Sequence, residues 1–316
     1  MNENKNTIDS QEEKKPAHDK KKLGNILLLI VAFLWGSSLT VVKGAQAYVN
    51  PNMILAIRFS VAALILAVVF WKKVRDMTKD DLKSGVSIGV FLFLAYSIQT
   101  VGVGYTDPGR SAFLSASYCV LVPFISWLVM KKRPDKFNVA AAIFCIIGIY
   151  FVSMAGGSEN SVLAQGRDAI IGDLLALLSG VFFASHIVAV TKFSKGKDPY
   201  LMTILQFATA AVLSALTTFF FEDNSAMVIN QRTFFELAYL AIMCTAVALL
   251  FQNIGQKYTD ETSAALILSL ESVFGILIPV FLGIEGLTIY TVIGFAMIFI
   301  AILISETKLS FLRPNS

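Results

Sequence analysis

Charged residues are scarce in this chain of 316 residues: only 15% are Asp, Glu, Lys or Arg, whereas 56% are hydrophobic. An ordinary soluble domain carries roughly 25% charged residues, so much of this chain must face something other than water. The charges gather in short runs, such as 72–83 and 131–136. The apolar runs between them have roughly 20 residues, the length that spans a bilayer as a helix. The composition excludes an ordinary soluble protein and predicts a polytopic membrane protein.

Cysteine is also rare. Cys119, Cys145 and Cys244 lie singly within apolar runs. Their odd number and the lack of metal-ligand spacing argue against a disulfide framework and against a zinc site. We therefore expect them to be small packing residues, and we expect neither a metal nor another cofactor.

Motifs for catalysis or ATP hydrolysis are missing as well. The chain has no His-Glu-x-x-His, no paired aspartates within its apolar runs and no Gly-x-x-x-x-Gly-Lys-[Ser/Thr], the last of which would mark a phosphate-binding loop. This excludes an ATP-driven pump within the chain and leaves an intramembrane enzyme as a remote alternative. The net charge of +4 is no signal for nucleic acid, because the basic residues stand where membrane topology would put them.

The chain divides into ten apolar segments and two polar ends. Residues 1–22 are polar and charged and are expected to form a disordered cytosolic tail. With this tail inside, 21 Lys and Arg residues fall in cytosolic pieces and 3 in outer loops, as the positive-inside rule requires. Both termini are therefore predicted to be cytosolic. The predicted spans are 23–45, 51–71, 85–104, 109–130, 137–155, 170–191, 199–221, 233–255, 262–283 and 287–305.

The two halves of the chain resemble each other. Residues 99–107 (QTVGVGYTD) and 252–260 (QNIGQKYTD) are identical at five of nine positions, and 111–120 aligns with 264–273 at the same offset. Similar phrases also begin the halves: Gly24-Asn25 resembles Gly172-Asp173, and FLWGS at 33–37 resembles VFFAS at 181–185. Such internal similarity indicates a structure that is built twice.

Five helices per half is an odd number, so the second half must enter the membrane upside down. The predicted fold is an all-α polytopic membrane protein of ten transmembrane helices arranged as two inverted five-helix repeats. Such repeats are typical of secondary transporters, whose substrate site lies between the repeats. The predicted parts are a first repeat at 23–155, a Gly/Ser-rich outer linker at 156–169, a second repeat at 170–305 and a cytosolic tail at 306–316.

Ionisable residues within apolar runs are costly in a bilayer and mark cavities, pathways or helix contacts. Glu271 is the deepest carboxylate, and it is a candidate proton carrier, counter-charge for a cationic substrate, or structural hydrogen bonder. His186 aligns with Ser38 of the first half, and two residues that align between the halves are called repeat mates below. His186 is a candidate partner in a proton pathway or a packing residue. Arg58 lies about two turns into its helix and is a candidate for binding an anionic substrate group or for structural pairing.

Further candidates for substrate binding are amides and aromatic side chains. Gln99 and Gln252, the latter with Asn253 beside it, are repeat mates that suit a polar substrate or helix-to-helix hydrogen bonds. Trp35, Tyr96 and Tyr118 are candidate cavity walls, and Tyr118 is the repeat mate of Glu271.

Four phrases of the sequence match a known pattern: FLWGS at 33–37, Arg58-Phe59, PGRSAFL at 108–114 and LSLESVF at 268–274. They closely resemble the EamA family of the drug/metabolite transporter superfamily. The resemblance covers about 23–305, with Ser272 where many members have proline and Gly283-Ile284-Glu285 where they have Gly-Glu. It implies transport of amino acids or related metabolites, often outward, through a cavity lined by both halves. Some members act on choline, sugars, nucleosides or toxic compounds.

The function expected is secondary active transport of a small polar organic metabolite, amino acid-like, across a bacterial cytoplasmic membrane. The mechanism expected is alternating access, in the direction of export, with protons as the candidate coupling ion at Glu271 and His186. The alternative is an uptake or exchange carrier for a cationic metabolite such as choline, or for a drug-like cation. The expected partners are the substrate, the lipid bilayer and protons, without nucleic acid, and the chain is expected to work as a monomer or weak homodimer.

Overall fold

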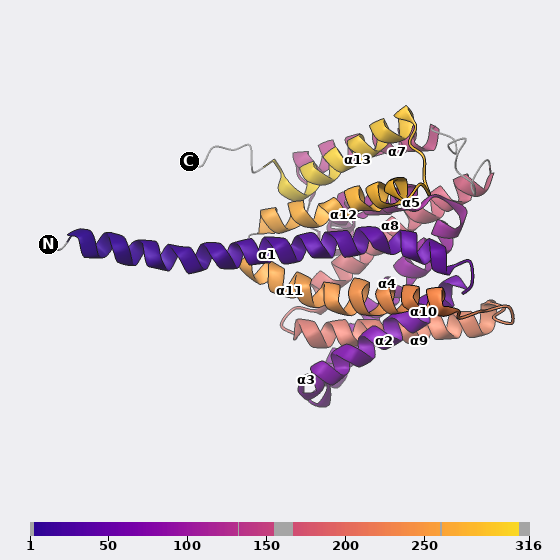
Figure 1. Cartoon of the computed structure of the whole chain (residues 1–316), viewed down its shortest axis with the longest axis horizontal. Helices are drawn as coiled ribbons and strands as arrows, with labels where there is room; N and C mark the ends of the chain where they lie inside the picture. Colours follow the sequence, from indigo (N-terminus) through magenta and orange to yellow (C-terminus); the bar gives the residue numbers. More distant parts are fainter. Residues whose placement is uncertain (1–2, 132, 155–166, 260, 310–316) are drawn as a thin grey trace.

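The computed structural model describes residues 3–131, 133–154, 167–259 and 261–309, and the regular structure in these ranges is all helical (Figure 1). The helices are α1 (Glu3–Ala45), α2 (Pro51–Val69), α3 (Trp71–Arg75), α4 (Lys79–Tyr105), α5 (Pro108–Ala116), α6 (Tyr118–Met130), α7 (Lys136–Met154), α8 (Arg167–Phe193), α9 (Pro199–Phe221), α10 (Gln231–Ala238), the π-helix η1 (Tyr239–Val247), α11 (Ala248–Tyr258), α12 (Glu261–Phe281) and α13 (Ile289–Thr307).

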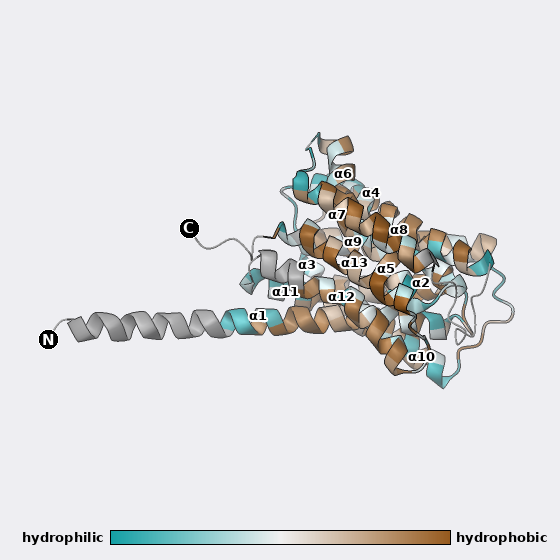
Figure 2. Cartoon of the chain, turned by 90° about the horizontal axis from the view of Figure 1, so that it is seen from above, coloured by the Kyte–Doolittle hydropathy of each residue, from teal (hydrophilic) through white to brown (hydrophobic). Residues whose placement is uncertain are grey.

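Within the described residues, seven helical stretches are long and apolar enough to cross a membrane, and three shorter apolar helices accompany them. Together they coincide with the ten predicted segments, whereas the number that cross the membrane stays a prediction. Figure 2 shows hydrophobic residues over the middle of the bundle and hydrophilic residues at its ends. Large apolar side chains such as Leu64, Val68 and Phe219 are exposed on the outside, where lipid would cover them.

One expectation about the N-terminus is corrected. Residues 1–22 were expected to be disordered, but α1 begins at Glu3 and continues into the first apolar segment. The physical reason is that Glu, Gln and Lys are good helix formers, and extending an existing helix avoids the cost of nucleation. Most of the predicted linker 156–169 and of the predicted tail 306–316 lies outside the described residues.

Local sequence explains where several helices begin. Pro51, Pro108 and Pro199 stand at the first helical position of α2, α5 and α9, where a missing N–H costs nothing. Thr78 caps α4 in a reciprocal capping box with Asp81.

Two segments that were expected to be single helices are interrupted. The span 109–130 divides at Ser117 into α5 and α6, and 233–255 contains η1 between α10 and α11. Pro123 in α6 frees the carbonyl four residues earlier, that of Cys119, which accepts a hydrogen bond from Ser305 Oγ of α13 at 3.1 Å. By contrast, α12 continues unbroken past Ser272.

Helices of the first half pack mainly on helices of the second half. The helix α1 lies between α11 and α12 (Figure 1), α2 packs on α9, α4 packs on α8 and α9, and α7 packs on α13. Neither half therefore forms a separate body. The beginning of α1 and the end of α13 lie at the same end of the bundle.

Candidate functional site

A cavity of about 290 Å³ lies between the two halves of the chain. Its wall takes residues from α1, α2, α4, α5 and α6 of the first half and from α8, α9, η1, α11 and α12 of the second. The polar and aromatic lining residues are Trp35, Ser38, Phe59, Tyr96, Gln99, Ser115, Tyr118, Phe183, His186, Gln206, Phe207, Thr245, Gln252, Glu271 and Ser272.

The cavity wall contains every site residue expected from the sequence except Arg58 and Asn253. Four pairs of repeat mates meet there: Trp35 with Phe183, Ser38 with His186, Gln99 with Gln252, and Tyr118 with Glu271. The members of each pair are about 150 residues apart in the chain, so only the interleaving of the halves brings them to one cavity.

Glu271 is the acidic side chain of the cavity wall. It is partly buried, and among the described residues none forms a hydrogen bond or an ion pair with its carboxyl group. The positive charge of Arg58 acts on it electrostatically. A carboxyl group in this situation can bind a proton or a cationic group of a ligand.

His186 faces the same cavity as Glu271. Its Nε2 atom shares a hydrogen bond of 2.7 Å with Oε1 of Gln206 on α9. Its repeat mate Ser38 donates to the carbonyl oxygen of Trp35 at 2.7 Å. Both ring nitrogens of a histidine can exchange protons, so the cavity wall carries two side chains that can exchange protons, His186 on α8 and Glu271 on α12, both in the second half of the chain.

The paired amides of the cavity differ in their partners. Gln99 donates through Nε2 to Ser115 Oγ at 2.9 Å, and Ser115 donates in turn to the carbonyl oxygen of Ser111 at 2.7 Å. No described residue forms a hydrogen bond with the side chain of Gln252. The amide of Gln252 can therefore both donate to and accept from a ligand.

Aromatic rings form a continuous part of the wall. The ring of Tyr96 meets those of Phe59 and Phe183 edge-on, at centroid distances of 5.2 and 5.1 Å. The ring of Tyr118 lies 5.9 Å from that of Phe183. Edge-to-face packing holds rings firmly, so these side chains give the cavity a fixed apolar surface.

Arg58 lies behind this wall. Its side chain is 2% exposed, its Nε atom donates to Thr245 Oγ1 at 2.6 Å, and its guanidinium carbon lies 5.0 Å from the centre of the Tyr96 ring. Contact of a guanidinium with an aromatic face is favourable. Arg58 thus joins α2 to the cavity wall and does not line the cavity.

The π-helix η1 supplies the partner of Arg58. Thr245 Oγ1 donates to the carbonyl oxygen of Leu240 five residues earlier, and Trp35 Nε1 donates to the carbonyl oxygen of Cys244 at 3.1 Å. π-helices are rare in proteins, and those that do occur often lie at functional sites. Here the π-helix offers a backbone carbonyl and a hydroxyl to the cavity wall.

Phe183, Gln206 and Thr245 are lining residues that the sequence did not single out. The alignment of the halves already paired Phe183 with Trp35, so repeat symmetry could have identified it. Gln206 and Thr245 could have been noted only as isolated polar residues within apolar runs. Their value depends on their partners His186 and Arg58, which the sequence does not reveal.

Two features that would suggest catalysis do not form a site. The expectation that motifs for catalysis are missing is wrong for one spacing, because residues 85–89 carry Gly-x-Ser-x-Gly. In hydrolases this spacing forms a turn between a strand and a helix. Here the stretch lies inside α4, and Ser87 donates to the carbonyl oxygen of Lys83 at 2.8 Å. Among the described residues, no three His, Cys, Asp or Glu side chains are placed to hold a metal ion.

Comparison with known proteins identifies the family. The EamA-like transporter family matches residues 22–154 and 170–307. The chain belongs to this family. As an EamA-like transporter it is a multi-pass membrane protein that moves small molecules and has a lipid environment.

The relatives of this EamA-like chain are named only as transporters. An uncharacterized transporter of Archaeoglobus fulgidus is 34% identical over 293 residues, 92% of this chain and 87% of the relative. The uncharacterized transporter YvbV of Bacillus subtilis is 25% identical over 288 residues, 90% of this chain and 91% of the relative. A solved crystal structure shares the fold, with a TM-score of 0.63 at 17% identity, over 94% of this chain and 100% of its own.

Proposed function

We propose that the chain is a secondary active transporter that works by alternating access and binds its substrate in the cavity between two inverted five-helix repeats, 23–155 and 170–305. The observation that carries the proposal is that four pairs of repeat mates line one cavity. In an inverted repeat, exchanging the conformations of the two halves converts an inward-open state into an outward-open one around the same site.

The helix packing supports the repeat. Under exchange of the halves, α1 corresponds to α8, α4 to α10–α11, and α5–α6 to α12. The contacts of α1 with α11 and α12 then correspond to those of α8 with α4 and with α5 and α6. The pairs α2–α9 and α7–α13 each correspond to themselves. Such a pattern is expected of a pseudo-two-fold axis in the membrane plane.

One pair of hydrogen bonds supports the same axis. Thr106 Oγ1 donates to Asp173 Oδ1 at 2.8 Å, and Thr259 Oγ1 donates to Asn25 Oδ1 at 3.0 Å. Thr106 and Thr259 hold the same place in the two related stretches 99–107 and 252–260, and Asn25 and Asp173 begin the first helix of each half.

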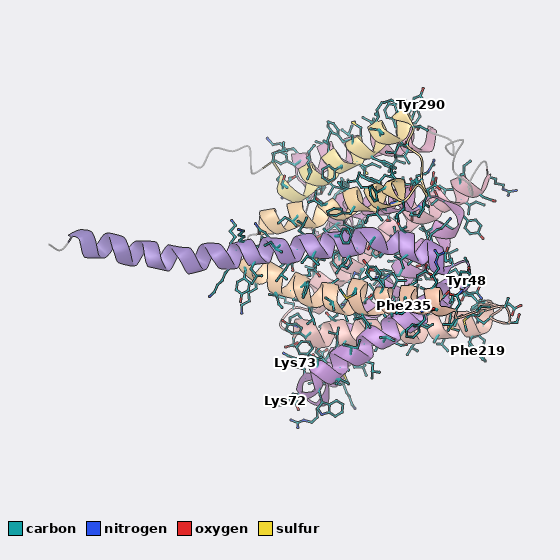
Figure 3. The ribbon with its side chains drawn as sticks, in the orientation of Figure 1. Tyr48, Lys72, Lys73, Phe219, Phe235 and Tyr290 are labelled. Carbon is teal, nitrogen blue, oxygen red and sulfur yellow. The ribbon has the colours of Figure 1, made fainter. Side chains whose placement is uncertain are left out.

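Both termini are proposed to be cytosolic. Figure 3 places Lys72 and Lys73 toward the end of the bundle where α1 enters, whereas Tyr48, Phe219 and Tyr290 lie toward the opposite end. Lysines gather on the cytosolic side of membrane proteins. One chain contains the whole cavity wall, which supports the proposal that a monomer, or a weak dimer of complete monomers, is the working unit.

The proposed substrate is a small polar organic metabolite, amino acid-like, that is exported. Glu271 suits an amino group, the free amide of Gln252 suits a carboxyl or hydroxyl group, and the aromatic rings suit an apolar part. A proton and the amino group would compete for Glu271, with His186 as a second proton acceptor. Competition of this kind couples substrate movement to proton movement in the opposite direction.

A second candidate is a carrier for a cationic metabolite or a drug-like cation. It is favoured by one observation: no Lys or Arg side chain is among the residues that line the cavity. A cation needs only the carboxyl group of Glu271 and the aromatic rings, whereas a zwitterion also needs a partner for its carboxylate.

The proposal can be tested in proteoliposomes that trap a pH-sensitive dye, with pools of amino acids, quaternary amines, sugars and nucleosides added outside. We expect proton flux with one pool, and in Glu271→Gln a fall of at least about tenfold, the factor that corresponds to roughly 1.4 kcal/mol of binding. Glu236→Gln, which changes a carboxyl group paired with Arg232 outside the cavity, is the matched control and should keep the flux.

Each outcome separates the alternatives. Flux with amino acids favours the exporter, and flux only with quaternary amines favours the cation carrier. Mass spectrometry of the trapped contents would detect a chemically altered compound if the chain were an intramembrane enzyme. Full flux and unchanged pH dependence in Glu271→Gln would remove this residue from the mechanism.

A further inference from the structure

Five ionisable side chains gather away from the cavity, at the end of the bundle where α1 ends. They are Lys43 of α1, Asp107 between α4 and α5, Arg110 of α5, Asp173 of α8 and Glu285 in the connection between α12 and α13. The cluster therefore joins elements of both halves. The proposed transport function does not use any of these groups.

The two basic side chains of the cluster have partners already. Arg110 forms an ion pair with Asp173, and both side chains are less than 10% exposed. Lys43 Nζ donates to the carbonyl oxygens of Val103 and Gly104, at 2.6 and 2.9 Å. These carbonyls belong to the last turn of α4, whose negative dipole end favours a cation.

Two carboxyl groups are left without an ion pair among the described residues, those of Asp107 and Glu285. Glu285 is 6% exposed, and its Oε2 atom accepts a hydrogen bond from the backbone N–H of Gly109 at 2.8 Å. A Cβ atom at Gly109 would lie 2.8 Å from Oε2 and 3.0 Å from Oε1 of Glu285. Glycine at this position is what allows the carboxyl group to enter.

The surroundings favour the protonated form of Glu285. Burial, and next the nearby carboxylate of Asp107, raise the pKa of Glu285 to about 8. Burial also raises the pKa of Asp107. A carboxyl group that is exposed to water has its pKa near 4.3, so the proton is held by the closed arrangement of this end.

At the repeat-related end of the bundle, two of the positions equivalent to members of the cluster are uncharged. Asn25 stands where this end has Asp173, and Ser263 stands where it has Arg110. The hydrogen bond between Thr259 and Asn25 keeps the contact between the helices there without an ion. The two ends are thus related in geometry and different in charge.

We propose that Glu285 is a proton-binding site separate from the transport cavity, which holds a proton while this end of the bundle is closed and releases it to water when the end opens. The inference rests on the proposed alternating access. The proton leaves the carboxyl group of Glu285 for a water molecule that enters with opening, and the charged carboxylate is then hydrated.

The sign of the pH effect follows from this exchange. Because the closed end binds the proton and the open end does not, a rise in pH favours the open end. Between about pH 4.5 and about pH 8 the ratio of open to closed ends rises by up to about tenfold per pH unit. Above the pKa of the closed state the dependence ends.

The test follows the access of a cysteine reporter to this end. Cys119, Cys145 and Cys244 are replaced by serine, Ser38→Cys is added in the cavity wall, and the protein is placed in vesicles with the connection between α9 and α10 outside. A membrane-impermeant maleimide is added outside, or in separate samples is trapped inside the vesicles, at pH values from about 5 to about 8. The rate in each variant is divided by the rate in Glu285→Gln, which removes the pH dependence of the thiol itself.

The parent is the protein that carries Ser38→Cys and no native cysteine, with Glu285 unchanged. We expect its ratio of labelling rates to rise with pH, because opening of this end uncovers the reporter. Glu236→Gln, a matched change outside the cluster, should give the same rise as the parent. Asp107→Asn removes the negative neighbour of Glu285, and the rise should therefore move to lower pH. This second variant keeps the test valid if Glu285→Gln fails to fold, with a free model thiol then used as the divisor.

A ratio that does not change with pH, together with labelling of the reporter from both sides of the membrane, would overturn the proton site and leave alternating access standing. A rise that Asp107→Asn does not move would also overturn it. Labelling from one side only, at every pH and in every variant, would overturn the proposed alternation and this inference together.

Discussion

At the scale of single residues, the structure separates polar side chains that face the cavity from those that hold its wall. Glu271 and Arg58 are both costly inside a membrane, and the sequence treats them alike. Glu271 lines the cavity without a hydrogen-bond donor among the described residues, whereas Arg58 is 2% exposed and donates to Thr245. A buried cation is tolerated only when it has partners. Arg58 is therefore a structural support and Glu271 is available to a ligand.

This assignment predicts the effect of removing the partner of Arg58. Thr245→Val keeps the shape of the side chain and removes the hydroxyl that accepts from Arg58 Nε. We expect a loss of about 1–3 kcal/mol in the free energy of unfolding, the cost of an unmet hydrogen bond to a charged group. Denaturant unfolding in mixed micelles measures it.

The control is Thr217→Val on α9, where the hydroxyl donates only to the carbonyl oxygen of Leu213 in its own helix. This change should alter the free energy of unfolding by no more than about 0.5 kcal/mol. Equal losses in the two variants would mean that the bond between Arg58 and Thr245 contributes nothing of its own.

At the scale of elements, close packing of α4 on α9 fixes one side of the cavity. A Cβ atom at Gly89 would lie 2.5 Å from Cβ of Thr209 and 2.8 Å from the backbone oxygen of Gln206. Gln206 is the partner of His186. Glycine in α4 therefore sets the position of a helix that carries a cavity residue, as small residues do between membrane helices.

Gly89→Ala should push α9 away, because neither a backbone atom nor a Cβ atom can move aside alone. We expect overpacking to lower the free energy of unfolding by about 1–3 kcal/mol. This loss is reduced by the roughly 1 kcal/mol by which alanine stabilises a helix relative to glycine. Gly104→Ala in the same helix is the control, since its nearest neighbour is the flexible tip of Gln46 at 3.2 Å. Thermal unfolding of both variants in detergent compares them, and equal midpoints would contradict this account of the α4–α9 contact.

The sequence does not predict the irregular elements. The apolar run at 233–255 predicts one helix, and the structure has a π-helix in its middle. Apolar periodicity does not distinguish the two kinds of turn. The wider turn is stabilised by contacts with distant residues, such as Trp35 with the Cys244 carbonyl and Arg58 with Thr245.

At the scale of the whole molecule, the interleaving of the halves makes a chain with an internal repeat into one body with one cavity.

Cytosolic termini remain a prediction from the charge bias, and labelling can test it. In a variant without native cysteines, Ser316→Cys should react with an impermeant maleimide only after cells are opened, and Ser225→Cys between α9 and α10 should react in intact cells. The reason is that lysines and arginines stay on the cytosolic side. Reaction at Ser316→Cys in intact cells would contradict the proposed topology.

The class of the protein, the apolar helices and eight of the polar and aromatic residues around the cavity could be predicted from the sequence alone. These follow from local properties: apolar length fits a bilayer, and polar residues in apolar runs are expensive enough to mark a site. Repeat similarity added which positions are equivalent, such as Tyr118 and Glu271.

Which of these residues line one cavity depends on the tertiary structure. Whether Glu271 and His186 face one cavity, whether Arg58 lies in the wall or behind it, and whether Glu285 enters a charged cluster all depend on contacts between residues far apart in the chain. The burial of a side chain and the partners it meets are set by helices of the other half. A local pattern can state that a polar residue needs a partner, but the partner is chosen by the packing of the whole chain.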